Sequence, residues 1–302
     1  HAVWRQLCLG ASARQYLGDP VPPRKESRLG RATSPQLRKG ITMLRPRLIA
    51  CLLIHNQGLV KTRQFGDPKY VGDPINAVRI FNEKAVDELM VIDIDATSKG
   101  REPDYRMIAN LATECRMPMC YCGGVSTVEQ IERVIGLGVE KVAISSAALA
   151  RPALIEEAAH RVGSQSVVVV LDIRKGGLLR RPEIVTHNAT RKTGLDPIAS
   201  VRAATLRGAG EIVINSVDRD GMMAGYDLDL VDRLRHETNL PMTVLGGAGS
   251  LDHVANLWRA QGIIGAAAGS LFVFKGKYRA VLINYPNADE KAALLGRAGW
   301  TL

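Results

Sequence analysis

An aspartate and two glycine doublets follow apolar runs, where each could do chemistry. Asp172 ends the run 167–171, and a carboxylate at the end of a buried strand can act as a general acid or base. Gly123-Gly124 and Gly246-Gly247 also end such runs, and glycine lets backbone N–H groups approach an anion closely. These residues predict acid–base chemistry beside two anion sites.

The anion-site candidates repeat along the chain. The doublets recur after 123 positions, the pairs Ser145-Ser146 and Gly269-Ser270 after 124, and Asp93 recurs as Asp218 after 125. Three markers at nearly one offset indicate two homologous halves. Two opposite cradles would suit a substrate with a phosphate at each end, although the glycines could serve tight turns alone. The candidate phosphate-binding residues are Gly124, Ser145, Ser146, Asp220, Gly221, Gly247, Gly269 and Ser270.

The loop after the sixth apolar run holds further charged residues. Asp220 is a second acid–base candidate, whereas Asp218 and Arg219 are better interpreted as a loop ion pair.

Four of the apolar runs each begin with a charged residue, two basic and two acidic. Singly these are ordinary rim residues, but together they could close one end of a barrel, because an unpaired buried charge is costly. They are Arg47, Glu88, Lys141 and Glu211.

Eight short apolar runs alternate with longer helical patterns, and this order must position those side chains. Near-continuous apolar strands joined by helices are typical of parallel strands buried on both faces. Eight such units predict an α/β fold, a (β/α)8 TIM barrel with a two-fold half-barrel repeat, whose active site lies at the carboxyl ends of the strands. The runs are 48–54, 89–93, 118–122, 141–145, 167–172, 211–215, 242–245 and 263–269.

Residues 1–42 differ in composition from the barrel expected over 43–302. They hold eight basic and two acidic side chains, so they carry +6 of the net charge of +10. Four prolines and no regular period predict a disordered extension. Met43 is the expected natural start, and a basic docking or targeting arm is the alternative.

Composition argues against several classes of protein. Aromatic residues make up only 5%, which disfavours a base-stacking nucleic-acid platform. The sequence contains no run of about 18 apolar residues, so we predict no membrane span. Five scattered cysteines suggest free thiols and the cytoplasm. Cys120 and Cys122 are expected to share one strand face rather than bind zinc, so we predict no metal and no cofactor.

Eight stretches between about Met43 and Pro286 carry a family likeness: Arg47-Leu-Ile-Ala-Cys51, Asp87-Glu-Leu-Met-Val-Ile-Asp93, Gly123-Gly-Val125, Gly163-Ser-Gln-Ser-Val-Val168, Lys192-Thr-Gly-Leu-Asp196, Ser216-Val-Asp-Arg-Asp-Gly221, Gly225-Tyr-Asp227 and Gly246-Gly-Ala-Gly249. Over this range the chain resembles the cyclase (HisF-type) subunit of imidazole glycerol phosphate synthase, an enzyme of histidine biosynthesis.

The resemblance implies a ribulosyl substrate with two phosphates and ammonia that travels through the barrel from a glutaminase (HisH-type) partner, in a heterodimer. Arg47, Glu88, Lys141 and Glu211 fall on the family's salt-bridged ammonia gate. This chain shows no glutaminase nucleophile motif, so the ammonia is expected from the partner.

Three positions depart from the family's pattern. Asp172 matches one of the family's two aspartates across the mouth, but the other falls on Leu53, which cannot transfer a proton. His55 lies on the same strand face one step higher and is a weaker substitute. Cys122 replaces a phosphate-loop glycine, and Ser145 replaces a ligand-contacting asparagine.

These departures resemble a divergent branch of second-copy subunits found with surface-polysaccharide genes. Leu52-Leu53, Gly58-Leu-Val-Lys-Thr62, Asp67-Pro-Lys-Tyr-Val-Gly-Asp73 and Leu282-Ile-Asn-Tyr-Pro286 carry that likeness. It implies a role in supplying ammonia for acetamidino groups on sugars. An active cyclase of histidine biosynthesis and a non-catalytic scaffold that activates the glutaminase remain alternatives.

Overall fold

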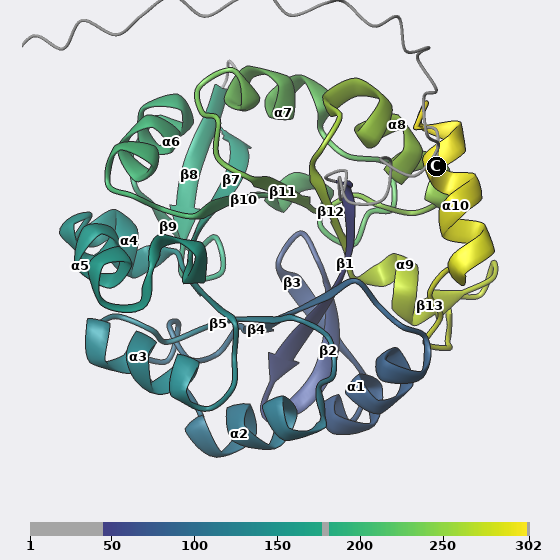
Figure 1. Cartoon of the computed structure of the whole chain (residues 1–302), viewed down its shortest axis with the longest axis horizontal. Coiled ribbons are helices and arrows are strands. Elements are labelled where there is room, and N and C mark those ends of the chain that lie inside the picture. Colours follow the sequence, from purple (N-terminus) through teal and green to yellow (C-terminus); the bar gives the residue numbers. More distant parts are fainter. Residues whose placement is uncertain (1–44, 177–180, 301–302) are drawn as a thin grey trace, which may run out of the picture. The chain divides into compact units, whose positions relative to one another are not determined.

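The apolar runs form one closed parallel barrel in this computed structural model, which describes residues 45–176 and 181–300 (Figure 1). Neighbouring strands pair in the order β1–β4–β5–β6–β7–β10–β11–β12, and β12 pairs with β1 to close the circle. The predicted TIM barrel is confirmed, whereas the extension expected over 1–42 lies outside the described residues. The strands are β1 (Arg47–His55), β4 (Glu88–Asp93), β5 (Met119–Cys122), β6 (Lys141–Ile144), β7 (Val167–Gly176), β10 (Glu211–Ser216), β11 (Met242–Leu245) and β12 (Gly265–Ala268).

Helices surround the barrel, and polar side chains fix where most of them begin. Asp73 accepts a hydrogen bond from the backbone of Asn76, and Thr127 forms a capping box with Gln130. Among the described helices, none is long and apolar enough to cross a membrane. The helices are α1 (Pro74–Glu83), α2 (Tyr105–Glu114), α3 (Val128–Gly136), α4 (Ser146–Ala150), α5 (Ala153–Val162), α6 (Pro197–Leu206), α7 (Leu228–Arg235), α8 (Leu251–Gln261), α9 (Ser270–Val273) and α10 (Ala288–Arg297), with short 3-10 turns at Ser164–Ser166 and Val217–Arg219.

The strands alternate between two cores because successive side chains point to opposite faces. Outward residues such as Leu48 and Leu52 pack against the helices. Inward residues fill the barrel with small and medium side chains, which are Ile49, Cys51, Met90, Cys120, Cys122, Ala143, Val168, Val170, Val213, Leu245 and Ala267. Cys120 and Cys122 therefore share the inner face, as predicted.

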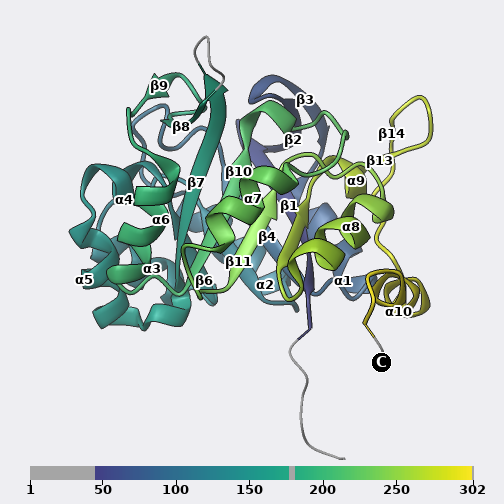
Figure 2. The same ribbon diagram turned by 90° about the horizontal axis from the view of Figure 1, so that it is seen from above.

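Antiparallel extensions that the sequence did not reveal rise above the strand ends. Figure 2 shows them at the end of the barrel opposite the start of β1. β2 continues from β1 through a tight turn and pairs with β3, while β8 folds back on the long strand β7. Their bounds are β2 (Gly58–Arg63), β3 (Gly66–Gly72), β8 (Arg181–Thr186), β9 (Arg191–Lys192), β13 (Phe274–Lys275) and β14 (Ala280–Val281). These hairpins extend the walls of the barrel mouth.

Candidate functional site

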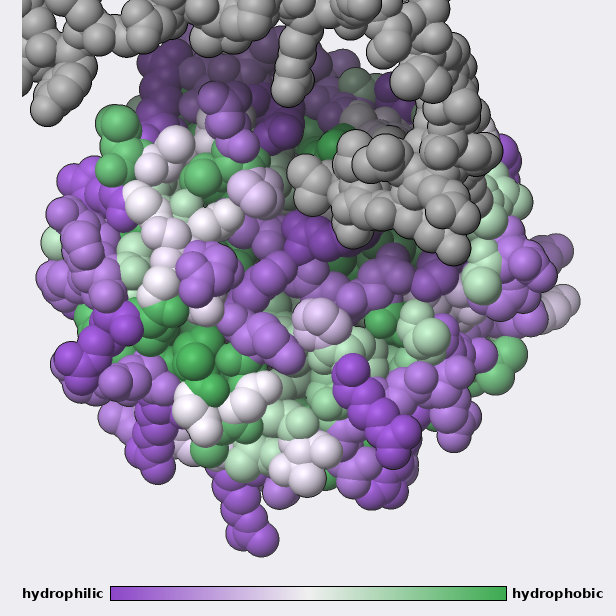
Figure 3. Space-filling model, viewed as in Figure 1, coloured by the Kyte–Doolittle hydropathy of each residue, from purple (hydrophilic) through white to green (hydrophobic). Residues whose placement is uncertain are grey.

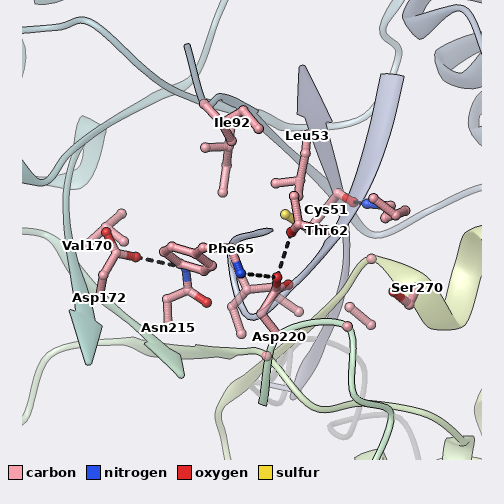
Figure 4. Close-up of a pocket in the computed structure, with 18 of the residues that line it drawn as sticks. Cys51, Leu53, Thr62, Phe65, Ile92, Val170, Asp172, Asn215, Asp220 and Ser270 are labelled. Carbon is pink, nitrogen blue, oxygen red and sulfur yellow. Dashed lines mark hydrogen bonds between the residues drawn. The ribbon is translucent and has the colours of Figure 1, made fainter. Parts of the chain in front are cut away.

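A cavity opens at the carboxyl ends of the barrel strands, with Asp172 and Leu53 on opposite walls (Figure 4). It gathers most of the predicted site residues: Ser145, Asp172, Asp220, Gly221, Gly247, Gly269 and Ser270. Gly124 and Ser146 line a second cavity, which also contacts Ser145. The sequence thus predicted side chains that do come together, although they are divided between two cavities that share Ser145.

Asp172 is held by polar neighbours at the top of β7. Asn215 Nδ2 donates to its Oδ1 at 2.8 Å, and Ser145 Oγ lies 3.4 Å from its Oδ2. Burial raises the pKa of Asp172 to about 6, although the hydrogen bonds from Asn215 and Ser145 oppose the shift. A carboxyl group that titrates near neutrality can both give and take a proton.

The wall that faces Asp172 is apolar. Leu53 and Ile92 come from the adjacent strands β1 and β4, and Cys122 lies beyond them on β5. Figure 4 shows Leu53 and Ile92 across the cavity from Asp172 and Asn215. Burial raises the pKa of Cys122 strongly, so this thiol is neutral. The β1–β4–β5 wall of the cavity therefore holds no carboxylate that could pair with Asp172.

Asp220 ties the β2–β3 hairpin to the loop that follows β10. Its Oδ2 accepts hydrogen bonds from Thr62 Oγ1 at 2.6 Å and from the backbone N–H of Phe65 at 3.1 Å. The hairpin thus lies over the mouth, and Phe65 lines the cavity. Asp220, predicted for phosphate binding, here has a carboxylate that positions this hairpin.

Lys61 on β2 places a buried amino group at the same rim. Its Nζ donates to the backbone carbonyl of Cys51 at 2.6 Å and lies against Gly269. A Cβ at Gly269 would come 2.6 Å from this nitrogen, so the glycine makes room for the lysine. Burial lowers the pKa of Lys61, and Cys51 and Asp220 oppose that shift. An amino group beside Gly269 and Ser270 is a hydrogen-bond donor that suits an anionic ligand.

The glycine doublets occupy equivalent positions in the two halves of the barrel. A Cβ at Gly123 would lie 2.6 Å from the carbonyl oxygen of Asp93, and one at Gly246 would lie 2.6 Å from that of Ser216. Gly124 adopts a φ of 70°, which favours glycine, and donates its N–H to Thr97 Oγ1 at 3.2 Å. The turn requirement and the close backbone approach are therefore both present, and each doublet borders a cavity.

The four predicted charges form a ring at the opposite end of the strands. Arg47 pairs with Glu88, and with Glu211 at 2.6 Å, while Lys141 pairs with Glu88 at 2.8 Å and Glu211 at 2.9 Å. Thr243 Oγ1 donates to Glu211 at 2.6 Å. Figure 3 shows hydrophilic side chains gathered near the centre of one end of the barrel. Each cation bridges both carboxylates, so the ring is closed and neutral.

Electrostatics favour the charged form of the ring. Burial alone would lower the pKa values of Arg47 and Lys141, but Glu211 and Glu88 outweigh it and raise both. Burial likewise would raise the pKa of Glu211, yet Arg47 and Lys141 lower it. These shifts favour the charged forms of Arg47, Lys141 and Glu211, and the ring cross-links β1, β4, β6 and β10.

The structure corrects one further prediction from the sequence and adds a residue to the site. The ion pair expected between Asp218 and Arg219 is wrong: Asp218 accepts the backbone N–H of Lys175 at 2.7 Å, and Arg219 donates to the carbonyl of Gly225 at 2.9 Å. Sequence reasoning missed Asn215, which the in-and-out alternation of β10 could have placed beside Asp172. Within residues 45–176 and 181–300, no group of three His, Cys, Asp or Glu side chains could hold a metal ion.

Comparisons with known proteins identify a family for this barrel. The family model described as "Histidine biosynthesis protein" matches residues 47–279. A Leptospira borgpetersenii protein, provisionally named imidazole glycerol phosphate synthase subunit HisF, is 55% identical over 83% of this chain and 99% of its own. A Pseudomonas aeruginosa protein provisionally named subunit hisF2 is 48% identical over 82% and 98%. The imidazole glycerol phosphate synthase subunit HisF of Streptococcus mutans is 36% identical over 76% and 91%.

Fold, repeat and sequence relationship therefore coincide over nearly the whole barrel. The matched region includes the ring, Asp172 and both glycine doublets. The chain belongs to the histidine biosynthesis protein family, among the HisF-type cyclase subunits of imidazole glycerol phosphate synthase.

Proposed function

We propose that this subunit takes ammonia from a glutaminase (HisH-type) partner at the charged ring and uses it at the mouth of the barrel, in a heterodimer. The observation that carries the proposal is the closed ring of Arg47, Glu88, Lys141 and Glu211 at the end opposite the cavity. Such a ring neutralises its own buried charges at the floor of the barrel.

The barrel interior supports a path for neutral ammonia. Between the ring and the cavity the inward side chains are apolar or thiol-bearing, among them Met90, Val168 and Val213. Such a lining excludes ammonium ions, because an unpaired charge is costly there, but it tolerates an uncharged molecule. Nitrogen released at the floor would thus reach Asp172 without mixing with bulk solvent.

The substrate class follows from the rim. Two glycine doublets on opposite sides of the mouth suit a ribulosyl substrate with a phosphate at each end, and Lys61 adds an amino group beside Gly269. Serine hydroxyls at Ser145, Ser146 and Ser270 face the same cavities. The substrate would span the mouth, with its reacting carbon near Asp172.

We further propose that this ammonia-using chemistry serves acetamidino modification of a surface sugar. The apolar wall at Leu53 and Ile92 supports a task distinct from that of an ordinary cyclase, because Asp172 lacks an opposing carboxylate there. The provisional names hisF2 and hisF3 of two relatives are consistent with second-copy genes. The four cysteines of the described region are unpaired, which fits a cytoplasmic enzyme.

Leu53 also favours a second candidate, a scaffold that activates the glutaminase without chemistry of its own. A third is the histidine-biosynthesis cyclase, which forms imidazole glycerol phosphate and AICAR. Complementation of a strain that lacks the cyclase tests the third: growth without histidine would favour it over the acetamidino role, and no growth would count against it.

Assembly separates the proposal from the scaffold. The chain should co-purify with one glutaminase subunit in a 1:1 complex. In that complex Asp172→Asn should abolish product formation while glutamine hydrolysis continues. Unchanged product formation by this variant would favour the scaffold.

A further inference from the structure

A histidine–aspartate pair lies at the rim, where β1 and β4 end. His55 Nδ1 lies 2.8 Å from Asp95 Oδ1, and the Asp95 side chain is buried. The other oxygen of Asp95 accepts the backbone N–H of Asn56 at 2.8 Å and pairs with Lys99 at 3.1 Å and Arg101 at 3.5 Å. Burial raises the pKa of Asp95, but the hydrogen bonds from Asn56, Lys99 and His55 outweigh it and lower the pKa. The carboxylate is thus a fixed negative charge behind the ring of His55.

The surrounding contacts also fix which nitrogen of His55 carries the proton. Lys99 Nζ donates to Asn56 Oδ1 at 3.0 Å, which leaves Asn56 Nδ2 as the group 3.0 Å from His55 Nε2. An amide nitrogen only donates, so Nε2 accepts and Nδ1 donates its proton to Asp95. This is the tautomer in which a carboxylate orients imidazole so that Nε2 can take a proton.

Residues next to the pair in the sequence line the two cavities. His55 follows Leu53 by two residues on β1, so both side chains point to the inner face, and Leu53 lines the central cavity. Ala96 and Thr97, directly after Asp95, line the cavity of the first glycine doublet. Asn56 and Gln57 take φ values of 46° and 62° in the tight turn that begins β2. Positive φ is costly for residues other than glycine, and this turn follows His55 directly.

Addition of ammonia to a ketone requires two proton transfers. The nitrogen bonds to the carbonyl carbon as the C–O π bond breaks, one base takes a proton from the nitrogen, and one acid protonates the oxygen, which gives a carbinolamine. Asp172 can serve as the acid. Asp220 is committed to Thr62 and Phe65, and Lys61 to the carbonyl of Cys51. The cavity itself therefore offers no free base on the wall opposite Asp172.

We propose that His55, oriented by Asp95, is this base and takes the role that Leu53 cannot fill. The inference rests on the proposed ammonia-dependent chemistry. His55 Nε2 exchanges its contact with Asn56 for the nitrogen that has joined the substrate, and the resulting imidazolium is stabilised by Asp95. The substrate is a ribulosyl compound with two phosphates, whose ketone lies between Asp172 and His55.

The test measures turnover of the two-phosphate ribulosyl substrate by the full chain with ammonium chloride as the nitrogen source. His55→Ala and His55→Gln should lower kcat by about 100-fold or more with little change in KM. Added imidazole should restore part of the activity of His55→Ala, which a merely structural role would not allow. Asp95→Asn should lower kcat because it no longer favours the reactive tautomer.

Two variants serve as controls. His160→Ala, on α5 and remote from the mouth, should leave kcat unchanged. Asn56→Gly removes the amide but accepts the positive φ of the turn, so it should affect kcat less than His55→Ala. Wild-type kcat in His55→Gln, or a loss in His55→Ala that imidazole does not restore, overturns the inference alone. A wild-type chain without ammonium-dependent turnover overturns both the inference and the proposed function.

Discussion

Removing Lys141 should weaken both the fold and the transfer of ammonia. Lys141→Ala breaks two ion pairs, at 2.8 and 2.9 Å, and leaves Arg47 alone to neutralise Glu88 and Glu211, which are 3% and 5% exposed. Loss of one partner from a buried pair typically costs about 3–5 kcal/mol. Because Arg47 still contacts both carboxylates, we expect about 3 kcal/mol, the lower end of that range.

Urea unfolding of the purified chain measures this change, and Arg202→Ala provides the matched control. Arg202 pairs with Glu237 at 2.6 Å, but its side chain is 62% exposed, so its loss should cost less than about 1 kcal/mol. In the complex with the glutaminase, the ratio of glutamine hydrolysed to product formed should rise in Lys141→Ala alone. Equal destabilisation of the two variants together with an unchanged ratio would refute the reasoning on the ring.

Three further perturbations have defined outcomes. The pKa of Glu211 is lower in the folded state than its ordinary 4.5, so the carboxylate stabilises the fold above about pH 4.5. This contribution is lost as the pH falls further. Urea unfolding at pH 7 and pH 3 should show the loss in the wild type and less of it in Glu211→Gln. The pKa of Asp172 is raised from 3.8 to about 6, so the protonated carboxyl group stabilises the fold at low pH, and that stabilisation is lost above pH 6. The free energy of unfolding of Asp172→Asn should therefore rise by about 2 kcal/mol relative to that of the wild type between pH 4 and pH 8. An equal difference between the two proteins at both pH values would contradict the burial of this charge. Gly124→Ala places a Cβ 2.7 Å from the carbonyl oxygen of Arg101 at a φ of 70°, so it should raise KM for the phosphorylated substrate and cost at least about 1 kcal/mol in thermal unfolding, whereas Gly136→Ala, with open space around it, should do neither.

The strands and the ring could be predicted from sequence because both depend on local pattern. Runs such as 167–171 are apolar on both faces, which a barrel strand requires, and a charge at the start of each of four strands must share one end of the barrel. The two glycine doublets also indicated the two-fold repeat, because each lies in a backbone conformation that only glycine adopts easily.

The hairpins and the side-chain pairs above the mouth could not be predicted this way. The segment 58–72 contains Gly58, Gly66, Pro68 and Gly72, and its second strand is mostly exposed, so it carries no buried alternation. His55 and Asp95 are 40 positions apart, and only the closed barrel brings them together. The loop ion pair of Asp218 and Arg219 was wrong because backbone groups nearby competed successfully for both side chains.

The charged ring divides unequally between the two homologous halves. Arg47, Glu88 and Lys141 belong to the first half and Glu211 to the second, so a first-half fragment carries one surplus positive charge at its floor and a second-half fragment one negative charge. Separately expressed halves should consequently recognise each other and reassemble, in preference to pairing with themselves. If the two halves were ever encoded by separate genes, their opposite charges would have favoured pairing of a first half with a second half over pairing of two identical halves.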